Sequence, residues 1–142
     1  AAAAAAALAA QCALQTEPWD LRAPISGRMG LHTGSAEERE GDYYGAVINR
    51  VARLMAAGHG GQTLLSDVTQ ALTRDLLPPA ASLLALGEHR LKDLSRPEPV
   101  FQLLHMVIGN RAEVHALDHP QRVARAPDHG RGRDHRDPAA AP

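Results

Sequence analysis

Three polar side chains surround a helix start in the stretch "GDYYGAVINRVARLM", which runs from Gly41 to Met55. Asp42 precedes the expected helix, whereas Asn49 and Arg53 are four residues apart and share one helix face. A carboxylate can accept a hydrogen bond from the amino group of a base, and an amide can position a sugar or phosphate oxygen. A guanidinium can bind two phosphate oxygens at once. Together these side chains would suit a site for a nucleotide polyphosphate.

The same spacing has a simpler interpretation. Asp42 would cap the helix, and Asn49 and Arg53 would be ordinary surface residues. Polar pairs four residues apart are common on helices, so spacing alone favours this interpretation. The choice depends on the rest of the sequence.

Hydrophobic periodicity predicts the elements that position these residues. Residues 45–57 form an amphipathic helix, with Val47, Val51 and Leu54 on one stripe and Ile48, Ala52 and Met55 beside it. Strands are expected near residues 29–32, 62–66, 82–91 and 98–104, and a second helix from Ser66 or Asp67 to Leu76. Residues 35–40 allow either a returning strand or a charged excursion. This alternation predicts a mixed α+β fold, an α/β sandwich.

Composition limits the class of protein. The chain has 142 residues, enough for one ordinary domain, with 44% apolar and 22% charged residues, as in soluble globular proteins. A net charge of −1 argues against a dominant electrostatic attraction to nucleic acid or to an anionic membrane. Cys12 is the only cysteine, so an internal disulfide is impossible and a cytoplasmic location is expected.

We divide the chain into three segments. Residues 1–16 form an Ala-rich helix that is too short to span a membrane and lacks the basic leader of a secretory signal. Its abrupt start predicts a chain that begins inside a domain, and Cys12 is expected to be a small buried residue on it. Residues 17–105 form the main body. Residues 106–142 are rich in Arg, Asp, His, Pro and Gly, a composition that predicts a disordered tail.

Residues 28–104 contain several motifs in order. The stretches are "RMGLHTG", "DYYGAVINRVARLM", "GGQTLLS" and "LGEHRLKDLSRPEPVFQLLH". They resemble the C-terminal half of the class III adenylate/guanylate cyclase catalytic domain, in the variant often fused to ATPase-type transcription regulators. Val51 stands where the family often has a small residue, which is a mild departure.

The resemblance implies a ferredoxin-like nucleotide-cyclase core, in which two domains pair head to tail around an active site that converts ATP to cyclic AMP and pyrophosphate. One domain supplies aspartates for two Mg²⁺ or Mn²⁺ ions. The other supplies the base-selecting and transition-state residues. By position, Asp42 selects adenine, Asn49 orients the ribose and Arg53 stabilises charge on phosphate. Lys92 is a further candidate that could reach the triphosphate, although a solvated lysine is the simpler interpretation.

The metal half of that site has no counterpart in this sequence. The family's metal aspartates lie upstream of the Ala-rich helix, so we expect no metal ligands in the chain and a core that is incomplete at its N-terminal side. Because metal ions neutralise charge in the transition state, the chain alone is expected to be inactive. It would need ATP and a dimer partner that supplies the aspartates. The alternatives are a non-catalytic regulatory or dimerisation module, or the remnant of a larger cyclase-regulator protein.

Several other polar residues could take part in metal binding, nucleic-acid binding or catalysis, but their patterns indicate this only weakly. A metal site in the tail would use His115 and His119, four residues apart, joined by Asp118 and by His129 or His135, although a solvated tail is the simpler interpretation. The Arg residues of the tail are nearly matched by acids, so nucleic-acid binding is not expected. We expect His32 to be a structural, partly buried group, and Ser66 to lack the neighbouring His and Asp that would make it a nucleophile.

Overall fold

The structure is a computed structural model that describes residues 1–106. The predicted tail, apart from Met106, lies outside the described residues. The elements, in chain order, are α1 (Ala2–Thr16), β1 (Met29–Leu31), β2 (Glu37–Arg39), β3 (Asp42–Tyr44), α2 (Ala46–Ala56), β4 (Thr63–Ser66), α3 (Asp67–Thr73), the 3-10 turn η1 (Arg74–Leu76), β5 (Ala81–His89) and β6 (Glu98–His105).

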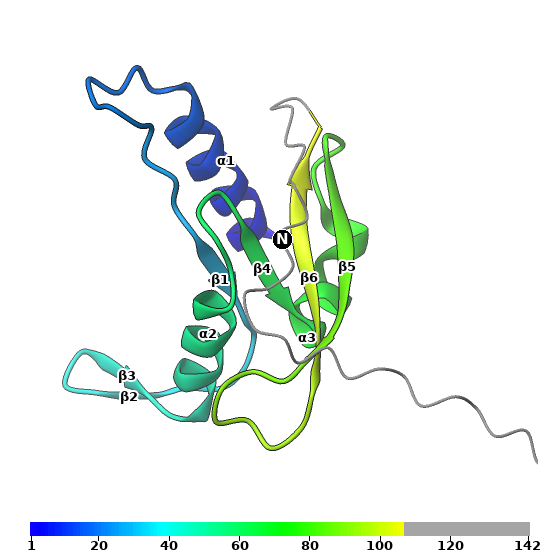
Figure 1. Ribbon diagram of the computed structural model, residues 1–142. Helices are drawn as coiled ribbons and strands as arrows, with labels where there is room; N and C mark the ends of the chain where they lie inside the picture. The colour runs from blue at the N-terminus through cyan, green and yellow to red at the C-terminus, as the bar shows by residue number, and fades with distance from the viewer. Residues whose placement is uncertain (107–142) are drawn as a thin grey trace, which may run out of the picture.

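Four strands form the main sheet, in the order β1-β4-β6-β5 (Figure 1). β1 runs parallel to β4, while the β4–β6 and β5–β6 pairs are antiparallel. Within the described residues β1 therefore lies at one edge of the sheet, with β4 as its neighbour. The mixed α+β class predicted from the sequence is confirmed.

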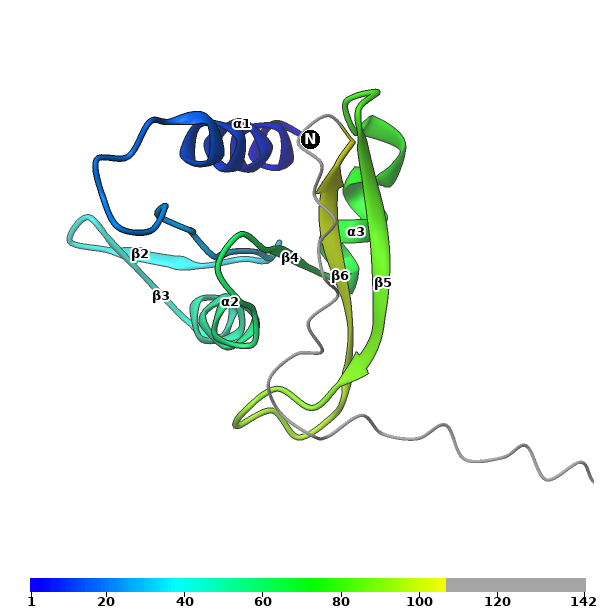
Figure 2. The same ribbon diagram turned by 45° about the horizontal axis from the view of Figure 1, so that its top comes forward.

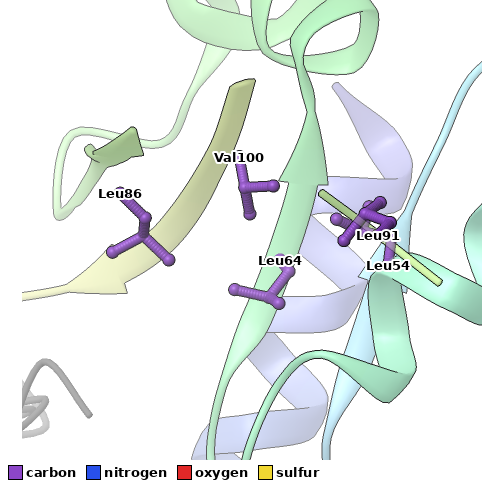
Figure 3. Close-up of a cluster of buried hydrophobic side chains, with 5 residues drawn as sticks. All are labelled: Leu54, Leu64, Leu86, Leu91 and Val100. Atoms are coloured by element: carbon purple, nitrogen blue, oxygen red, sulfur yellow. The ribbon is translucent and has the colours of Figure 1, made fainter. Parts of the chain in front are cut away.

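Helices α1 and α2 lie on opposite sides of β1 and β4 (Figure 2). Successive side chains of a strand point to opposite faces of a sheet, so neighbouring Leu64 and Leu65 serve different clusters. The cluster on the α2 side contains Leu54, Leu64, Leu86, Leu91 and Val100 (Figure 3). The cluster on the α1 side contains Ala4, Leu8, Leu65 and Leu103. Both helices are thus fixed to the sheet by leucine side chains.

The Ala-rich helix forms where the sequence predicts it. The buried side chain of Gln11 donates hydrogen bonds to the carbonyl oxygens of Gly27 (3.0 Å) and Gln62 (3.4 Å). These bonds tie α1 to the segments that flank β1 and β4. Cys12 was expected to be buried but is partly exposed, because it lies beside the face that packs on the sheet. Within residues 1–106, no helix is long and apolar enough to cross a membrane.

Strands β2 and β3 form a separate hairpin that projects from the body (Figures 1 and 2). Of the two alternatives for residues 35–40, the structure has a strand, Glu37–Arg39. This strand pairs with β3 and not with the main sheet. Glu40 and Gly41 connect the strands with φ of 55° and 82°. Two positive φ values are typical of the tight turn whose twist matches a hairpin. The turn places Asp42 directly after its tip.

Helix α2 approaches β1 closely at Gly30. A Cβ atom built at Gly30 would lie 3.0 Å from the Cβ of Met55 and 3.1 Å from its backbone nitrogen. A larger residue would therefore push the helix away from the strand. The absence of a side chain at Gly30 sets how near the C-terminal half of α2 lies to the sheet.

Candidate functional site

Asn49 and Arg53 lie one turn apart on α2, as the sequence predicts. The helix begins after Gly45, whose φ is 126°, and the carbonyl oxygen of Gly45 accepts hydrogen bonds from the backbone of Ile48 (3.1 Å) and Asn49 (3.5 Å). Glycine adopts such a φ without steric cost. The side chain of Asn49 is exposed, and that of Arg53 is half-buried. Asn49 can therefore meet a ligand arriving from solvent.

The loop between β5 and β6 brings an aspartate to Arg53. The Nη2 atom of Arg53 lies 2.8 Å from the Oδ2 atom of Asp93, in a charge-assisted contact. Sequence reasoning missed Asp93. A possible signal was its place in the "LKD" hairpin, because the family motif has either Gly or Asp there. Arg53 thus has an anionic neighbour on the surface, and its role at phosphate stays a prediction.

Asp42 lies in β3 and is exposed. One of its carboxylate oxygens accepts a hydrogen bond from the backbone N–H of Tyr43 at 2.8 Å. The simpler interpretation, in which Asp42 caps the helix, is wrong, since the N-cap residue of α2 is Gly45 and no side chain bonds there. In the described part of the chain no hydrogen bond or ion pair joins Asp42 to Asn49 or Arg53, so its role in base selection stays a prediction.

Lys92 is exposed and immediately precedes Asp93. The ion pair between Arg53 and Asp93 therefore places the loop that carries Lys92 beside α2. This arrangement is compatible with two cations near one phosphate chain. The assignment of Lys92 to triphosphate binding stays a prediction.

The described residues do not fit a divalent metal centre. Among residues 1–106, no three His, Cys, Asp or Glu side chains gather closely enough to hold a metal ion. The family's two metal ions thus have no matching ligand set in this part of the chain. The tail candidates His115, Asp118, His119, His129 and His135 lie outside the described residues.

His32 and Ser66 meet on the main sheet. The Nδ1 atom of His32 lies 2.8 Å from the Oγ atom of Ser66, which lies 3.1 Å from the Oγ1 atom of Thr69. The expectation that Ser66 has no histidine nearby is wrong, because β1 and β4 are parallel neighbours. Ser66 is buried, and no carboxylate in residues 1–106 hydrogen-bonds to the other nitrogen of His32. This geometry fits a structural role for His32, as predicted, better than a role as the base that activates a nucleophilic Ser66.

His32 and Ser66 border a pocket of about 250 Å³. It is lined by His32, Arg50, Ser66, Asp67, Val68, Glu98 and Pro99. Two of the lining residues form an ion pair, with the Nη2 atom of Arg50 3.1 Å from the Oε1 atom of Glu98. Burial lowers the pKa of His32, and the positive charge of Arg50 lowers that pKa further, while Glu98 opposes both effects.

The lowered pKa of His32 predicts a loss of stability in acid. Because the native state binds a proton to His32 less readily than the unfolded chain does, the stabilising effect is complete above the unfolded pKa of about 6.5. It is lost as the pH falls below that value toward the lower native pKa. We expect the denaturant concentration at the midpoint of unfolding to be lower at pH 5.5 than at pH 7.5. The decrease should be smaller in His32→Gln. Equal losses in the two proteins would contradict this assignment.

One face of α2 carries exposed apolar side chains. Leu54 is buried as predicted, and Val47 and Val51 are half-buried. Ile48 and Met55 remain 38% and 39% exposed, and their spacing of seven residues places them on one face of the helix. Two large aromatic side chains of β3, Tyr43 and Tyr44, are also exposed. The candidate site is thus bordered by apolar surface that a second domain could cover.

Comparison with curated proteins finds close relatives that carry no functional name. An uncharacterized protein of Mycobacterium tuberculosis is 50% identical over 97 residues, which are 68% of this chain and 34% of that protein. The chain spans about a third of the length of such relatives. A receptor-type adenylate cyclase of Trypanosoma brucei brucei is 33% identical over 82 residues, which are 54% of this chain and 14% of that protein. No protein-family model matches the chain.

Solved structures with the same fold are cyclases. The adenylate/guanylate cyclase/hydrolase from Silicibacter pomeroyi superposes with a TM-score of 0.56 and 29% identity, covering 71% of this chain and 62% of that one. An adenylate cyclase from Trypanosoma brucei superposes with a TM-score of 0.50 and 28% identity, covering 61% of this chain and 40% of that one. The described residues therefore have the fold of a nucleotide cyclase domain, and Asn49 and Arg53 lie on one of its helices.

Proposed function

We propose that this chain is an adenylate-cyclase-like domain that supplies the base-selecting and transition-state residues of a shared active site. The reaction is the conversion of ATP to cyclic AMP and pyrophosphate. The observation that carries the proposal is the placement of Asn49 and Arg53 one turn apart on an exposed part of α2, within a fold shared with cyclases.

Each residue has a distinct role in this reaction. The ribose 3′ oxygen attacks the α-phosphorus, and pyrophosphate leaves. Arg53 donates hydrogen bonds to phosphate oxygens as negative charge develops on them, which favours the transition state over bound ATP. The amide of Asn49 holds a ribose oxygen so that the 3′ oxygen lies in line with phosphorus. Lys92 would contact the triphosphate from the neighbouring loop.

The metal aspartates would come from a partner cyclase domain, since residues 1–106 offer no fitting ligand set. The exposed Ile48, Met55, Tyr43 and Tyr44 support such a pairing, because they would be buried against the partner. The same proposal places the chain in the cytoplasm with its substrate ATP. By its resemblance, the domain would belong to a larger protein that also carries an ATPase-type transcription regulator.

Complementation in trans tests the proposal. The chain is mixed with a cyclase domain that keeps its metal aspartates but has lost its own Asn and Arg, and cyclic AMP formed from manganese-ATP is measured. We expect more cyclic AMP than the mutant domain makes alone. A folded chain that binds this domain yet forms no cyclic AMP would refute the catalytic role.

Asp42 is expected to set the choice of base in the same assay. Its carboxylate accepts a hydrogen bond from the amino group of adenine and repels the carbonyl oxygen that guanine carries at that position. Asp42→Ala should therefore lower the ratio of kcat/KM for ATP to that for GTP by about 10-fold to 100-fold. Glu38→Ala, which removes another exposed carboxylate of the hairpin, is the control. An unchanged ratio in Asp42→Ala would remove Asp42 from base selection.

The second candidate is a non-catalytic module that pairs with a cyclase or a regulator. The exposed apolar side chains of α2 and β3 favour it, because they suit a partner surface whether or not catalysis follows. Binding without complementation would support this candidate.

A further inference from the structure

The loop between β5 and β6 bears on how Arg53 meets its ligand. We propose that Asp93 is a positioning residue that holds Arg53 by an ion pair and competes with the phosphate chain of a ligand for its guanidinium. The inference rests on the proposed function, since the ligand is a nucleotide polyphosphate. Removal of the Asp93 carboxylate should therefore strengthen polyphosphate binding.

The contact itself occupies the group that phosphate needs. The Nη2 atom of Arg53 lies 2.8 Å from the Oδ2 atom of Asp93, so a donor of the guanidinium already has an anionic partner. A phosphate oxygen bound at the same donor would lie close to that carboxylate and be repelled by it. The other arginine on this part of α2, Arg50, is paired with Glu98 instead. Asp93 must consequently move away before Arg53 can bind phosphate with both arms of its fork.

The hydrophobic core fixes the loop that carries Asp93. The side chain of Leu91 is buried beside Leu54, the residue that follows Arg53 in the chain (Figure 3). Leu94 packs against the same cluster, and its backbone N–H donates to the carbonyl oxygen of Leu91 at 3.2 Å. Arg53 thus precedes buried Leu54, and Asp93 precedes partly buried Leu94 of the same cluster. Their proximity follows from packing and does not depend on the ion pair alone.

The backbone of Asp93 does not require an aspartate. Its φ of 60° lies in the left-handed region, which glycine adopts freely and asparagine tolerates. Asp93→Gly and Asp93→Asn therefore remove the charge without straining the turn. This makes the side chain testable separately from the loop.

The strength of the pair suits a contact that opens on ligand binding. The side chains of Arg53 and Asp93 are 40% and 60% exposed, so water and salt weaken their attraction. An exposed pair of this kind is expected to change an affinity by only about two- to five-fold. A polyphosphate with several negative charges can displace a single carboxylate from such a pair.

Titration with inorganic tripolyphosphate tests the inference on the full chain without metal or partner. We expect Asp93→Asn and Asp93→Gly to lower the Kd by about two- to five-fold, and the gain to vanish in an Arg53→Ala background. Asp75→Asn is the matched control, because Asp75 also forms an exposed ion pair, with Arg74. An unchanged or weaker affinity in both Asp93 variants, or an equal gain without Arg53, would overturn the inference.

A kinetic measurement separates competition from orientation. In the complementation assay, Asp93→Asn should lower KM for ATP by about two- to five-fold and leave kcat unchanged. A fall in kcat would mean that Asp93 orients Arg53 in the transition state, which contradicts competition. If the wild-type chain forms no cyclic AMP, the proposed function fails, and the tripolyphosphate titration still decides the role of Asp93.

Discussion

Arg53→Ala is expected to lower cyclic AMP formation in the complementation assay by about 10²- to 10³-fold, the usual effect of losing one donor to transition-state charge. The physical reason is that charge grows on the phosphate oxygens during the reaction, and a fixed guanidinium in a water-excluding interface stabilises that growth more than it stabilises bound ATP. The loss should therefore appear mainly in kcat. Quantifying cyclic AMP at saturating manganese-ATP measures this directly.

Arg50→Ala is the matched control for this experiment. Arg50 lies on the same helix but pairs with Glu98 beside the His32 pocket, so its removal should leave kcat within about two-fold, as expected for a partly exposed ion pair. Arg53→Lys keeps the charge but not the planar fork, and it should recover part of the lost activity. Equal activity of Arg53→Ala and the wild-type chain would remove Arg53 from the transition state.

Leu54→Ala is expected to reduce the free energy of unfolding by about 2–5 kcal/mol. Leu54 is 1% exposed and belongs to one buried cluster with Leu64, Leu86, Leu91 and Val100, so truncation leaves a cavity where α2 meets the sheet (Figure 3). Native domains are stable by about 5–15 kcal/mol, and this loss is a large fraction of that margin. Urea unfolding followed by circular dichroism measures the difference.

The same substitution links the core to the site. Leu54 follows Arg53 and contacts the cluster that contains Leu91, so a looser core should also loosen the pairing of Arg53 with Asp93. Leu54→Met keeps most of the volume and should cost less than about 1.5 kcal/mol. Similar stability of Leu54→Ala and Leu54→Met would show that this cluster does not anchor α2.

Secondary structure followed largely from local sequence. The stripe of Val47, Val51 and Leu54 predicted a helix at 45–57, and the structure has α2 at Ala46–Ala56. The strands expected at 82–91 and 98–104 are β5 and β6, within two residues at each end. Periodicity and turn residues carry this information because they act between residues that are close in the chain.

The sequence predicted the exposure of individual side chains less well than it predicted secondary structure. Ile48 and Met55 flank the predicted buried stripe, yet they remain exposed, and Cys12 lies partly outside the core. Periodicity identifies the apolar face of a helix but not how much of that face the sheet covers. The covered area depends on the width of the sheet and on how closely Gly30 lets α2 approach.

The sequence by itself determined the helices and the four strands of the main sheet, the α+β class and the spacing of Asn49 and Arg53 on one helix face, but not the hairpin of β2 and β3. Only the tertiary structure decided that Arg53 meets Asp93 and that His32 meets Ser66. Torsional and hydrophobic preferences act over a few residues, whereas these two contacts join segments far apart in the chain. They exist because strands β1 and β4 pair and because Leu54 and Leu91 share one core.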